Sequence, residues 1–510
     1  MLIKNHFKEL GIIFLFLLST FIFACQENKQ SNIKEQNIIS NELLLQDIDT
    51  LESWIMNAHG DPFRFTTKEK FASRFKEAKQ SLKNSNGMTG EMFTGIVTPI
   101  MAELRDGHSH VWLPNPDKLE GQIFLPFRIV FVAYKPYVIN NLGNKNIPIG
   151  SEILEINDIK TNVIFDELSK LVIGDGNIKT SRYRKMESNF HLSKLLKLFG
   201  YSDDKYKIKF KTESGSINTY TAKALTQSEY MLKDKASVAK ISSKDTPNSI
   251  KKTNLPKAIT FNTLDSINNI GYLKITSFNP HYFQESYSVF EAEMNSIMQT
   301  VKNENIQKLI IDVRNNSGGE DVYVLHLLRH LAKKKFSIFS SLTFKLNNYK
   351  FLPDGRHWDI DPNAFKLNNK GTYDVTPVLS EDGPFPMGEF EPYENNFEGE
   401  IVVLINAYTF SAASDFSARL HHAKRATFIG EETGGSYIGN VSGFSPGMNL
   451  PNSSVGVSIA LVNIRQPFFD SNWTDRGVIP DIFIEPSVSD IINGKDAVLE
   501  KARLTIQGLK

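Results

Sequence analysis

The sequence predicts a mixed α/β protein in which a layered α/β core follows a helical region and a β-rich region. Apolar residues recur at helical spacing from Asn41 to Arg105. Short runs of Phe, Val, Ile and Tyr, separated by turn residues, begin at Phe124. From Phe261 onward short apolar strands alternate with helical segments and glycine-rich turns, a pattern that is typical of a layered α/β fold.

The composition is that of a globular protein with no charge bias. Apolar residues make up 41% of the 510 positions and charged residues 23%. The 58 Lys and Arg balance 57 Asp and Glu, which leaves a formal net charge of +1. This balance argues against a nucleic-acid partner.

The N-terminus has the pattern of a secretory signal. Two lysines precede the uncharged apolar run Gly11–Ala24, which is short for a transmembrane span, and Cys25 follows as the only cysteine. The phrase I-F-A-C resembles a bacterial lipobox, in which the cysteine is lipid-modified and becomes the mature N-terminus. The alternative is an ordinary signal peptide with an incidental cysteine. We expect a protein whose lipid on Cys25 attaches it to a bacterial cell-envelope membrane, on the periplasmic or surface side.

The helical region ends in a pair of histidines. Asp61-Pro62 interrupts its apolar pattern, and Thr66-Thr67-Lys68-Glu69 has the character of a new helix N-terminus with a capping residue. The region closes with Arg-Asp-Gly followed by His108, Ser109 and His110. Half of a zinc site, a general base and an exposed structural histidine are all compatible with this motif. No third and fourth ligand follow at metal spacing.

A phrase in the β-rich region, Asn146–Thr161, resembles the turn-strand-turn of a PDZ domain. Gly150 keeps the first glycine of that phrase, Ser151 replaces its usual Asp, and Asp158 replaces its closing Gly. We expect a helix from Asp166 to Val172. PDZ domains bind extended peptide ends by strand addition. The alternative is an unrelated β-rich insert with one similar hairpin.

The core contains a strand-turn-helix pattern around Ser411. The apolar run Ile401–Ile405 predicts a buried strand, and helical periodicity begins at Ser411. A serine at a helix N-terminus lies among free backbone N–H groups, which would stabilise an oxyanion during nucleophilic catalysis. The alternative is a plain N-cap. Gly318 and Gly319 form a second tight turn after the strand Leu309–Val313.

Six motifs in this order resemble one serine peptidase family. They are L-R-D-G-H-S, the PDZ-like phrase, I-I-D-V-R-N-N-S-G-G, T-F-S-A-A-S-D-F, G-E-E-T-G-G and R-G-V-I-P-D-I. The family includes the C-terminal processing peptidases, the tricorn protease core and the interphotoreceptor retinoid-binding repeats. The resemblance extends from about Leu44 to the C-terminus and implies a peptidase core of the ClpP/crotonase type.

The resemblance implies roles for residues of the core. Ser411 takes the place of the nucleophile, and the N–H of Ala412 with that of Gly318 or Gly319 would form the oxyanion hole. Ser414 stands where the family has Glu. One branch of the family uses a lysine base 25 residues after the serine, but position 436 is a serine, which excludes a Ser–Lys dyad there.

The tricorn-like branch takes its base from a histidine after the N-terminal helices. His108 matches that place, with His110 as the second candidate. That branch also uses a glutamate shortly before its G-V-x-P-D phrase, where Asp475 is the nearest carboxylate here. Gly107 stands where a serine often precedes the histidine.

We therefore expect an exported serine endopeptidase that cleaves peptides or proteins. Its PDZ-like domain would present the ends of the substrate to the core, and the enzyme would need no metal or organic cofactor. The rival hypothesis is a catalytically inactive binding protein on the same scaffold, because Ser414 and the third catalytic position depart from the family pattern. The expected segments are a signal peptide (1–25), a tether (26–41), a helical subdomain (42–118), a PDZ-like domain (119–225), a linker (226–257) and the peptidase core (258–510).

Overall fold

The computed structural model describes residues 38–114, 122–242, 256–353, 365–375, 386–469 and 471–509. The expected signal peptide, Cys25 and most of the expected tether lie outside these residues. Within them, no helix is both long and apolar enough to cross a membrane.

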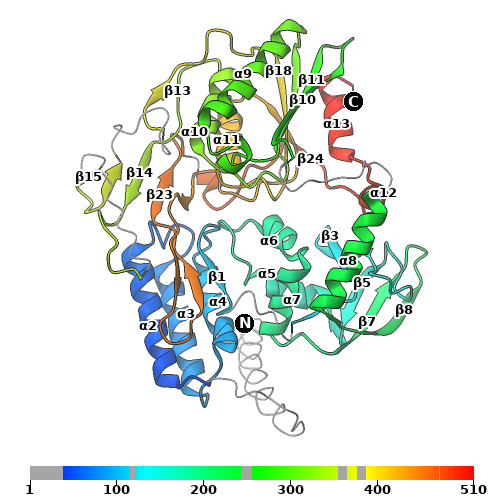
Figure 1. Cartoon of the computed structure of the whole chain (residues 1–510), viewed down its shortest axis with the longest axis vertical. Coiled ribbons are helices and arrows are strands. Elements are labelled where there is room, and N and C mark those ends of the chain that lie inside the picture. The colour runs from blue at the N-terminus through cyan, green and yellow to red at the C-terminus, as the bar shows by residue number, and fades with distance from the viewer. Residues whose placement is uncertain are drawn as a thin grey trace, which may run out of the picture.

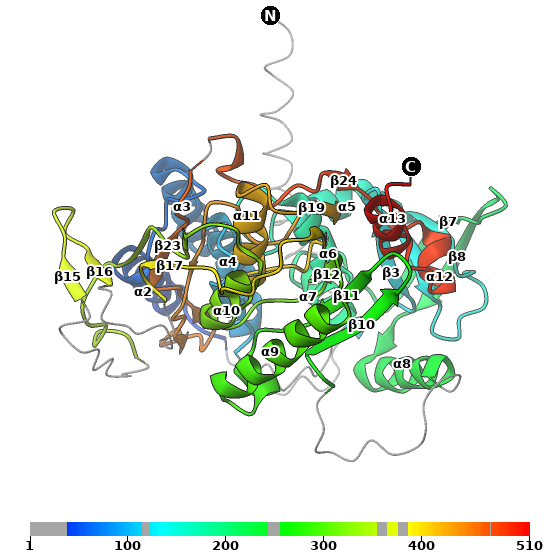
Figure 2. The same ribbon diagram turned by 90° about the horizontal axis from the view of Figure 1, so that it is seen from above.

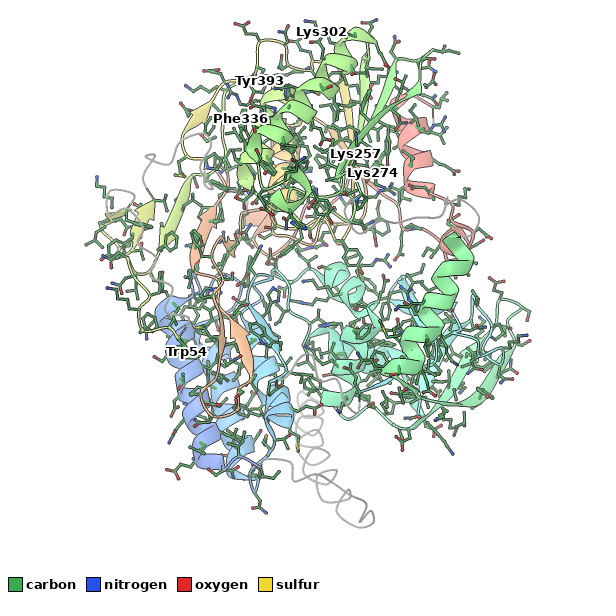
Figure 3. All side chains as sticks on the ribbon, viewed as in Figure 1. Trp54, Lys257, Lys274, Lys302, Phe336 and Tyr393 are labelled. Carbon is green, nitrogen blue, oxygen red and sulfur yellow. The ribbon has the colours of Figure 1, made fainter. Side chains whose placement is uncertain are left out.

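The N-terminal part is helical, as the sequence predicts. It consists of α2 (Asn41–Ala58), α3 (Lys68–Lys83) and α4 (Gly90–Glu103). Each helix begins at a capping side chain that accepts a backbone N–H, and Thr67 caps α3 as expected. Leu44, Ile48, Leu51 and Ile55 form a fully buried stripe on α2. The side chain of Trp54, on the same helix, is also buried (Figure 3).

A β-rich region follows and has its own hydrophobic core. Its main sheet has the order β3-β4-β5-β7-β8, and β6 pairs with β5. The strands are β2 (Ile123–Phe124), β3 (Arg128–Val132), β4 (Lys135–Asn140), β5 (Glu152–Ile156), β6 (Ile159–Lys160), β7 (Lys205–Lys211), β8 (Ile217–Lys223) and β9 (Leu225–Thr226). Alternate residues of β7, among them Tyr206, Ile208 and Phe210, face this core.

Helices cover the β-rich region, and four of them differ from the sequence expectation. The helix expected from Asp166 begins earlier, as α5 (Thr161–Ser169). Helices α6 (Lys179–Met186) and α7 (Asn189–Leu198) were not predicted; α6 is so polar that it shows no apolar period. The expected linker contains helix α8 (Gln227–Ser242), which is docked because the Tyr230 ring stacks on the Phe124 ring at 4.8 Å.

A six-stranded sheet of order β10-β11-β12-β18-β19-β24 organises the C-terminal part. β10 is antiparallel to β11, and the remaining neighbours are parallel. The strands are β10 (Ile259–Asp265), β11 (Ile270–Ile275), β12 (Lys308–Asp312), β18 (Glu400–Ile405), β19 (Thr427–Gly430) and β24 (Ile482–Phe483). The helices around this sheet are η1 (Pro280–Phe283), α9 (Tyr287–Asn303), α10 (Asp321–Leu331), α11 (Ala412–His422), α12 (Val488–Asn493) and α13 (Ala497–Ile506).

The buried residues of β18 alternate between two cores, because successive side chains of a strand point to opposite faces. Val402 and Leu404 pack in a small core with α13. Val403 and Ile405 belong to the larger core shared with α9, α10 and α11. The sheet is thus covered on both faces, and the predicted layered α/β arrangement is confirmed (Figure 1).

Short strands extend the C-terminal part toward the helices. These are β13 (Phe336–Ser337), β14 (Ser341–Phe344), β15 (Phe365–Leu367), β16 (Tyr373–Val375), β17 (Glu389–Phe390), β20 (Val441–Ser442), β21 (Gly447–Asn449), β22 (Gly456–Ser458) and β23 (Val462–Arg465). Two of these strands follow each other closely but belong to different sheets, because β22 pairs with β21 whereas β23 pairs with β14. The short helix η3 (Ser471–Trp473) precedes β24 in the chain.

One strand joins the helical region to the core. β1 (His110–Trp112) directly follows α4 and pairs antiparallel with β22, with His110 opposite Ser458. In Figure 1, α2 to α4 lie below the core on one side and the β-rich region lies below it on the other. Figure 2 shows the same molecule from above, with α9 at the edge of the core. The loop before β1 therefore enters the space where the three parts meet.

Candidate active site

Ser411 lies on a strained turn between β18 and α11. Its φ of 52° and ψ of −131° fall in a region that costs a non-glycine residue about 1–3 kcal/mol. Ser411 occupies the N-cap position of α11, but its hydroxyl caps no backbone N–H. The Phe410 N–H donates to Asn316 O at 3.0 Å and so ties the turn to the neighbouring glycine loop. This geometry leaves the Ser411 hydroxyl free for another partner.

Among the described residues, the backbone N–H groups of Ala412 and Gly319, near Ser411, have no acceptor. Ala412 is the first residue of α11, so its N–H has no partner within the helix. In the part of the chain that the structure describes, the Gly319 N–H also lacks an acceptor, whereas the Gly318 N–H donates to Asn316 Oδ1 at 2.8 Å. Of the two glycines predicted for the oxyanion hole, Gly319 thus has the available donor.

Gly318 instead permits the close approach of the two turns. Its φ is +100°, and a Cβ there would lie 2.7 Å from Ser411 Cβ and 3.0 Å from Ala412 N. Any side chain at this position would be strained and would displace the Ser411 turn.

The loop between α4 and β1 brings His108 to Ser411. The distance from His108 Nε2 to Ser411 Oγ is 3.1 Å, although the two residues are 303 positions apart in the chain. The His108 ring stacks on the Phe410 ring with centroids 4.6 Å apart, which fixes its orientation. His110, the second candidate, instead begins β1, where its backbone N–H donates to Ser458 Oγ. The structure thus brings His108, and not His110, to Ser411.

A buried carboxylate from the same loop, Asp106, lies beside His108. Its oxygens accept hydrogen bonds from Ser109 Oγ at 2.6 Å, from the His108 backbone N–H at 2.9 Å and from His59 Nε2 at 3.1 Å. The distance from Asp106 Oδ1 to His108 Nδ1 is 3.6 Å, which is an ion-pair contact rather than a hydrogen bond. The Asp106 carboxylate therefore faces the ring nitrogen that points away from Ser411.

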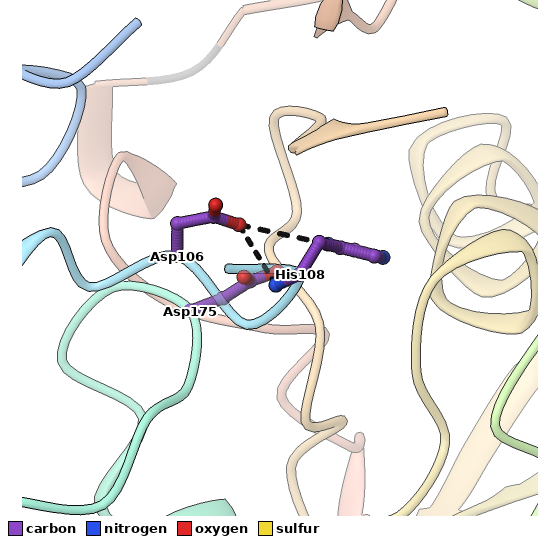
Figure 4. A group of neighbouring side chains, drawn as sticks. All are labelled: Asp106, His108 and Asp175. Atoms are coloured by element: carbon purple, nitrogen blue, oxygen red, sulfur yellow. Dashed lines mark hydrogen bonds and ion pairs between the residues drawn. The ribbon is translucent and has the colours of Figure 1, made fainter. Parts of the chain in front are cut away.

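A second carboxylate, Asp175, reaches the same place from the β-rich region (Figure 4). It accepts backbone N–H groups from Gly107 at 2.7 Å and from Ser436 at 3.0 Å. Sequence reasoning missed both Asp106 and Asp175. The phrase Gly-Asp-Gly around Asp175 was the available signal, since flanking glycines let other backbone segments approach a carboxylate.

The charges at this site shift the pKa values of all three residues. Burial opposes ionisation of Asp106, but the interactions with the His108 and His59 side chains outweigh it and hold the Asp106 pKa well below its ordinary value. Burial raises the pKa of Asp175, and the nearby Asp106 adds to this effect. Burial disfavours the imidazolium of His108, but the interaction with Asp106 and the charge of Asp175 raise its pKa above 6.5. The site is thus arranged to hold a proton on His108.

Asp475, the expected third catalytic residue, does not contact His108. Its carboxylate accepts a hydrogen bond from Asn177 Nδ2 at 2.5 Å, and its backbone carbonyl accepts from the Asn177 N–H at 2.8 Å. It therefore supports the loop that carries Asp175. The sequence spacing located Asp475 near the site but could not distinguish a carboxylate in the site from one in the supporting layer.

Ser414 and Ser436, which depart from the pattern that the family resemblance implies, have local structural contacts. Ser414 donates to Thr409 O at 2.8 Å and accepts the Gly435 N–H at 3.2 Å, which joins the Ser411 turn to the Gly-Glu-Glu-Thr-Gly-Gly loop. Ser436 is buried, and its N–H binds Asp175. Arg476 holds that glycine loop through two hydrogen bonds of 2.8 Å to the Glu432 carboxylate.

Asp106, His108 and Asp175 also form a possible metal-ligand set. Their ligand atoms lie within 4.8 Å of one another. However, protein donors already bind the oxygens of both carboxylates, and His108 Nε2 faces Ser411. This arrangement fits an imidazole held between carboxylates better than a metal site. His110 does not belong to the set.

Comparison with known proteins relates part of the chain to one peptidase family. Residues 269–484 match the model of peptidase family S41. This part of the chain, which contains β11 to β24 and Ser411, is thus similar to peptidase family S41, and the similarity supports a serine-type peptidase that acts on proteins or peptides.

Among solved structures, the chain is similar to mature CPAF, with a TM-score of 0.59 and 17% identity over 92% of this chain and 98% of that chain. It is also similar to mature CPAF complexed with lactacystin, with a TM-score of 0.58 and 17% identity over 92% and 99% of the two chains. At this level of identity the similarity shows the fold alone.

Proposed function

We propose that this chain is a member of peptidase family S41 and an exported, lipid-anchored serine endopeptidase with Ser411 as nucleophile. One observation carries the proposal: Ser411 Oγ lies 3.1 Å from His108 Nε2 on a strained turn at the start of α11. A hydroxyl within hydrogen-bond reach of an imidazole, beside free N–H groups, meets the geometric requirements of acyl transfer.

In the proposed reaction, Ser411 Oγ attacks the scissile carbonyl carbon while His108 Nε2 takes the hydroxyl proton. The carbonyl oxygen becomes an oxyanion that accepts the Ala412 and Gly319 N–H groups. His108 then gives the proton to the leaving amine, and an acyl-enzyme remains. A water molecule, deprotonated by His108, hydrolyses this ester and restores Ser411.

In this proposal Asp106 and Asp175 act where the sequence suggested Asp475. Both carboxylates lie beside His108, and their charges favour the imidazolium that forms when Ser411 loses its proton. Asp475 has a positioning role, because it binds the Asn177 backbone and side chain in the Asp175 loop.

The β-rich region would act as a PDZ-like domain that presents substrate ends to a core of the ClpP/crotonase type. Its five-stranded path ends in β3 and β8, and such edges bind extended peptides by strand addition. Since the region also supplies Asp175 to the site, a peptide held on it would be close to Ser411.

The proposed anchor is a lipid on Cys25. The support is the charged, apolar and small-residue pattern that precedes this cysteine. Radiolabelled palmitate should enter the full chain in a bacterial host and should not enter a Cys25→Ser variant. Equal labelling of the two proteins would contradict the anchor and leave the peptidase proposal untouched.

A fluorophosphonate probe tests the proposed nucleophile. We expect labelling of the intact protein and no labelling of Ser411→Ala; His108→Ala should lose labelling while keeping its circular dichroism spectrum. Labelling should be tested between pH 6 and about 9, near the range in which imidazole is neutral. If the intact, folded protein fails to label in this range, the result would favour the hypothesis of an inactive binding protein. Labelling that survives in His108→Ala would identify a different base.

A further inference from the structure

The two proposed oxyanion-hole donors come from different loops. Gly319 lies in the loop that leaves the carboxyl end of β12, and Ala412 follows the turn that leaves the carboxyl end of β18. The two strands are parallel neighbours, with Asp312 opposite Leu404. An oxyanion is well stabilised only when each donor lies about 2.7–3.1 Å from it. The alignment of the two loops beyond the strand ends therefore decides whether the oxyanion hole is complete.

Two asparagines join these loops just beyond the strands. The Asn315 backbone N–H donates to Asn406 Oδ1 at 3.0 Å, and Asn406 Nδ2 donates to Asn315 Oδ1 at 2.8 Å. Asn406 Oδ1 also accepts the Tyr408 N–H at 3.1 Å, within the turn that leads to Ser411. We call the two hydrogen bonds between Asn315 and Asn406 the asparagine clamp.

The asparagine clamp continues the pairing of the two strands after the backbone has turned away. In the parallel register, the Val313 N–H donates to Leu404 O at 3.1 Å. Two residues further on, Asn406 O instead accepts the Thr409 N–H at 2.8 Å and so belongs to the turn. The Asn406 side chain takes its place, because an amide offers the same acceptor and N–H donor as a peptide group. A side chain without an amide would leave this end of the pairing open.

Hydrogen bonds hold the outer side of the two loops, where packing is weak. Asn315 is exposed, Asn406 is half-buried, and both line a cavity of about 240 Å³. On the buried side, Thr409 Oγ1 donates to Val313 O at 3.1 Å, and the bond from the Phe410 N–H described above adds to this contact. Without the clamp the loops would be attached on the buried side alone and free to tilt. A displacement of about 1 Å in a reacting arrangement costs about 100-fold in rate.

We propose that Asn315 and Asn406 are positioning residues, which hold the Gly319 and Ala412 N–H groups at the separation that an oxyanion requires. The inference rests on the proposed peptidase function. Each asparagine acts through the backbone of its own loop. The proton acceptor His108 belongs to a different loop, so loss of the clamp should slow acylation without changing how acylation depends on pH.

The rate of fluorophosphonate labelling of the full chain, measured against pH, tests the asparagine clamp. The phosphoryl oxygen of this probe occupies the position of the oxyanion. Asn406→Ala removes both hydrogen bonds and should lower the rate by about 10- to 100-fold, the scale of a misplaced oxyanion donor, with an unchanged pH dependence.

Two substitutions of the exposed partner separate the clamp from the fold. Asn315→Gly removes the Oδ1 acceptor and suits the local backbone, since the φ of Asn315 is 63°. It should slow labelling by about 2- to 10-fold, the effect of one lost neutral hydrogen bond. Asn315→Asp keeps the acceptor and tolerates the same φ, so it should label at close to the rate of the intact protein.

A double variant and a matched control complete the test. Because the two asparagines act as one unit, Asn315→Gly combined with Asn406→Ala should label no more slowly than Asn406→Ala alone. The control is Asn305→Gly, at the opposite end of β12. Asn305 is also exposed and has a φ of 51°, but its Oδ1 accepts Gln307 Nε2 at 2.9 Å. This control should label normally.

Several results would overturn the clamp. Folded Asn406→Ala and Asn315→Gly proteins that label normally would do so, as would a moved pH profile, which would assign the effect to His108. A double variant whose loss is the product of the single losses would also refute it. If Asn406→Ala does not fold by circular dichroism, equal rates in Asn315→Gly and Asn315→Asp would decide against the clamp. An intact protein that does not label would overturn the peptidase function instead.

Discussion

Replacing Asp106 with Asn should lower both the pKa of His108 and the rate of serine acylation. The Asp106 carboxylate lies 3.6 Å from His108 Nδ1. At an effective dielectric constant of about 20, two unit charges at this distance interact by about 4–5 kcal/mol. The pKa of a group beside an opposite charge typically changes by about 1–3 units. Because Asp175 remains, we expect a decrease in the His108 pKa within that range.

The sign of the pH effect follows from the role of His108. The neutral imidazole accepts the Ser411 proton, so activity is lost as the pH falls through the His108 pKa. This decrease of activity toward low pH is the acid limb of the pH profile. In the intact protein it should lie above pH 6.5, since the His108 pKa is raised above that value. In Asp106→Asn the limb should move to lower pH, while the plateau rate decreases by about 10²- to 10³-fold because the imidazolium loses stabilisation.

The rate of labelling by a fluorophosphonate, measured against pH, gives both quantities without a known substrate. Ser109→Ala is the matched control, since it removes one hydrogen bond to Asp106 and leaves the charge in place. Its acid limb should stay within a few tenths of a pH unit of the intact protein, as a surviving charge pair implies. An unchanged acid limb in a folded Asp106→Asn protein would refute the electrostatic role of Asp106.

Three further substitutions test the surrounding structure. In Gly318→Ala the new Cβ would lie 2.7 Å from Ser411 Cβ. We therefore expect fluorophosphonate labelling to fall by at least about 100-fold, the scale of a lost oxyanion donor. Normal labelling would contradict the close approach of the two turns. Ser414→Ala leaves a buried N–H without its acceptor and should lower the unfolding free energy in urea by about 1–3 kcal/mol; an unchanged midpoint would show that the contact is unimportant. In the intact protein the Arg184 guanidinium lies 2.6 Å from the buried Glu431 carboxylate. Arg184→Met leaves this carboxylate unpaired and should lower the unfolding free energy in the same assay by about 3–5 kcal/mol. A loss below about 1 kcal/mol, the value of an exposed ion pair, would contradict the importance of this buried pair.

The sequence by itself determined the local features of this protein. The apolar run before Ser411 and the small residues after it specify a strand, a turn and a helix, because strand and helix periods are visible in the residues that form them. The glycine pair at 318 and 319 was identified in the same way, since a tight turn requires glycine. These patterns predicted the layered core and the position of the proposed nucleophile.

Only the tertiary structure decided which distant side chains join Ser411. The sequence favoured His108 over His110 only by a family resemblance, whereas the pairing of β1 with β22 fixes His110 opposite Ser458 and leaves His108 in the loop that faces the site. Asp175 reaches the site from the β-rich region and accepts the Gly107 N–H, whereas Asp475 binds Asn177 in the loop that carries Asp175. Periodicity and spacing describe residues that are neighbours along the chain. Contacts between regions depend on how complete elements pack against one another, and this packing brings Ser411, His108 and Asp175 together.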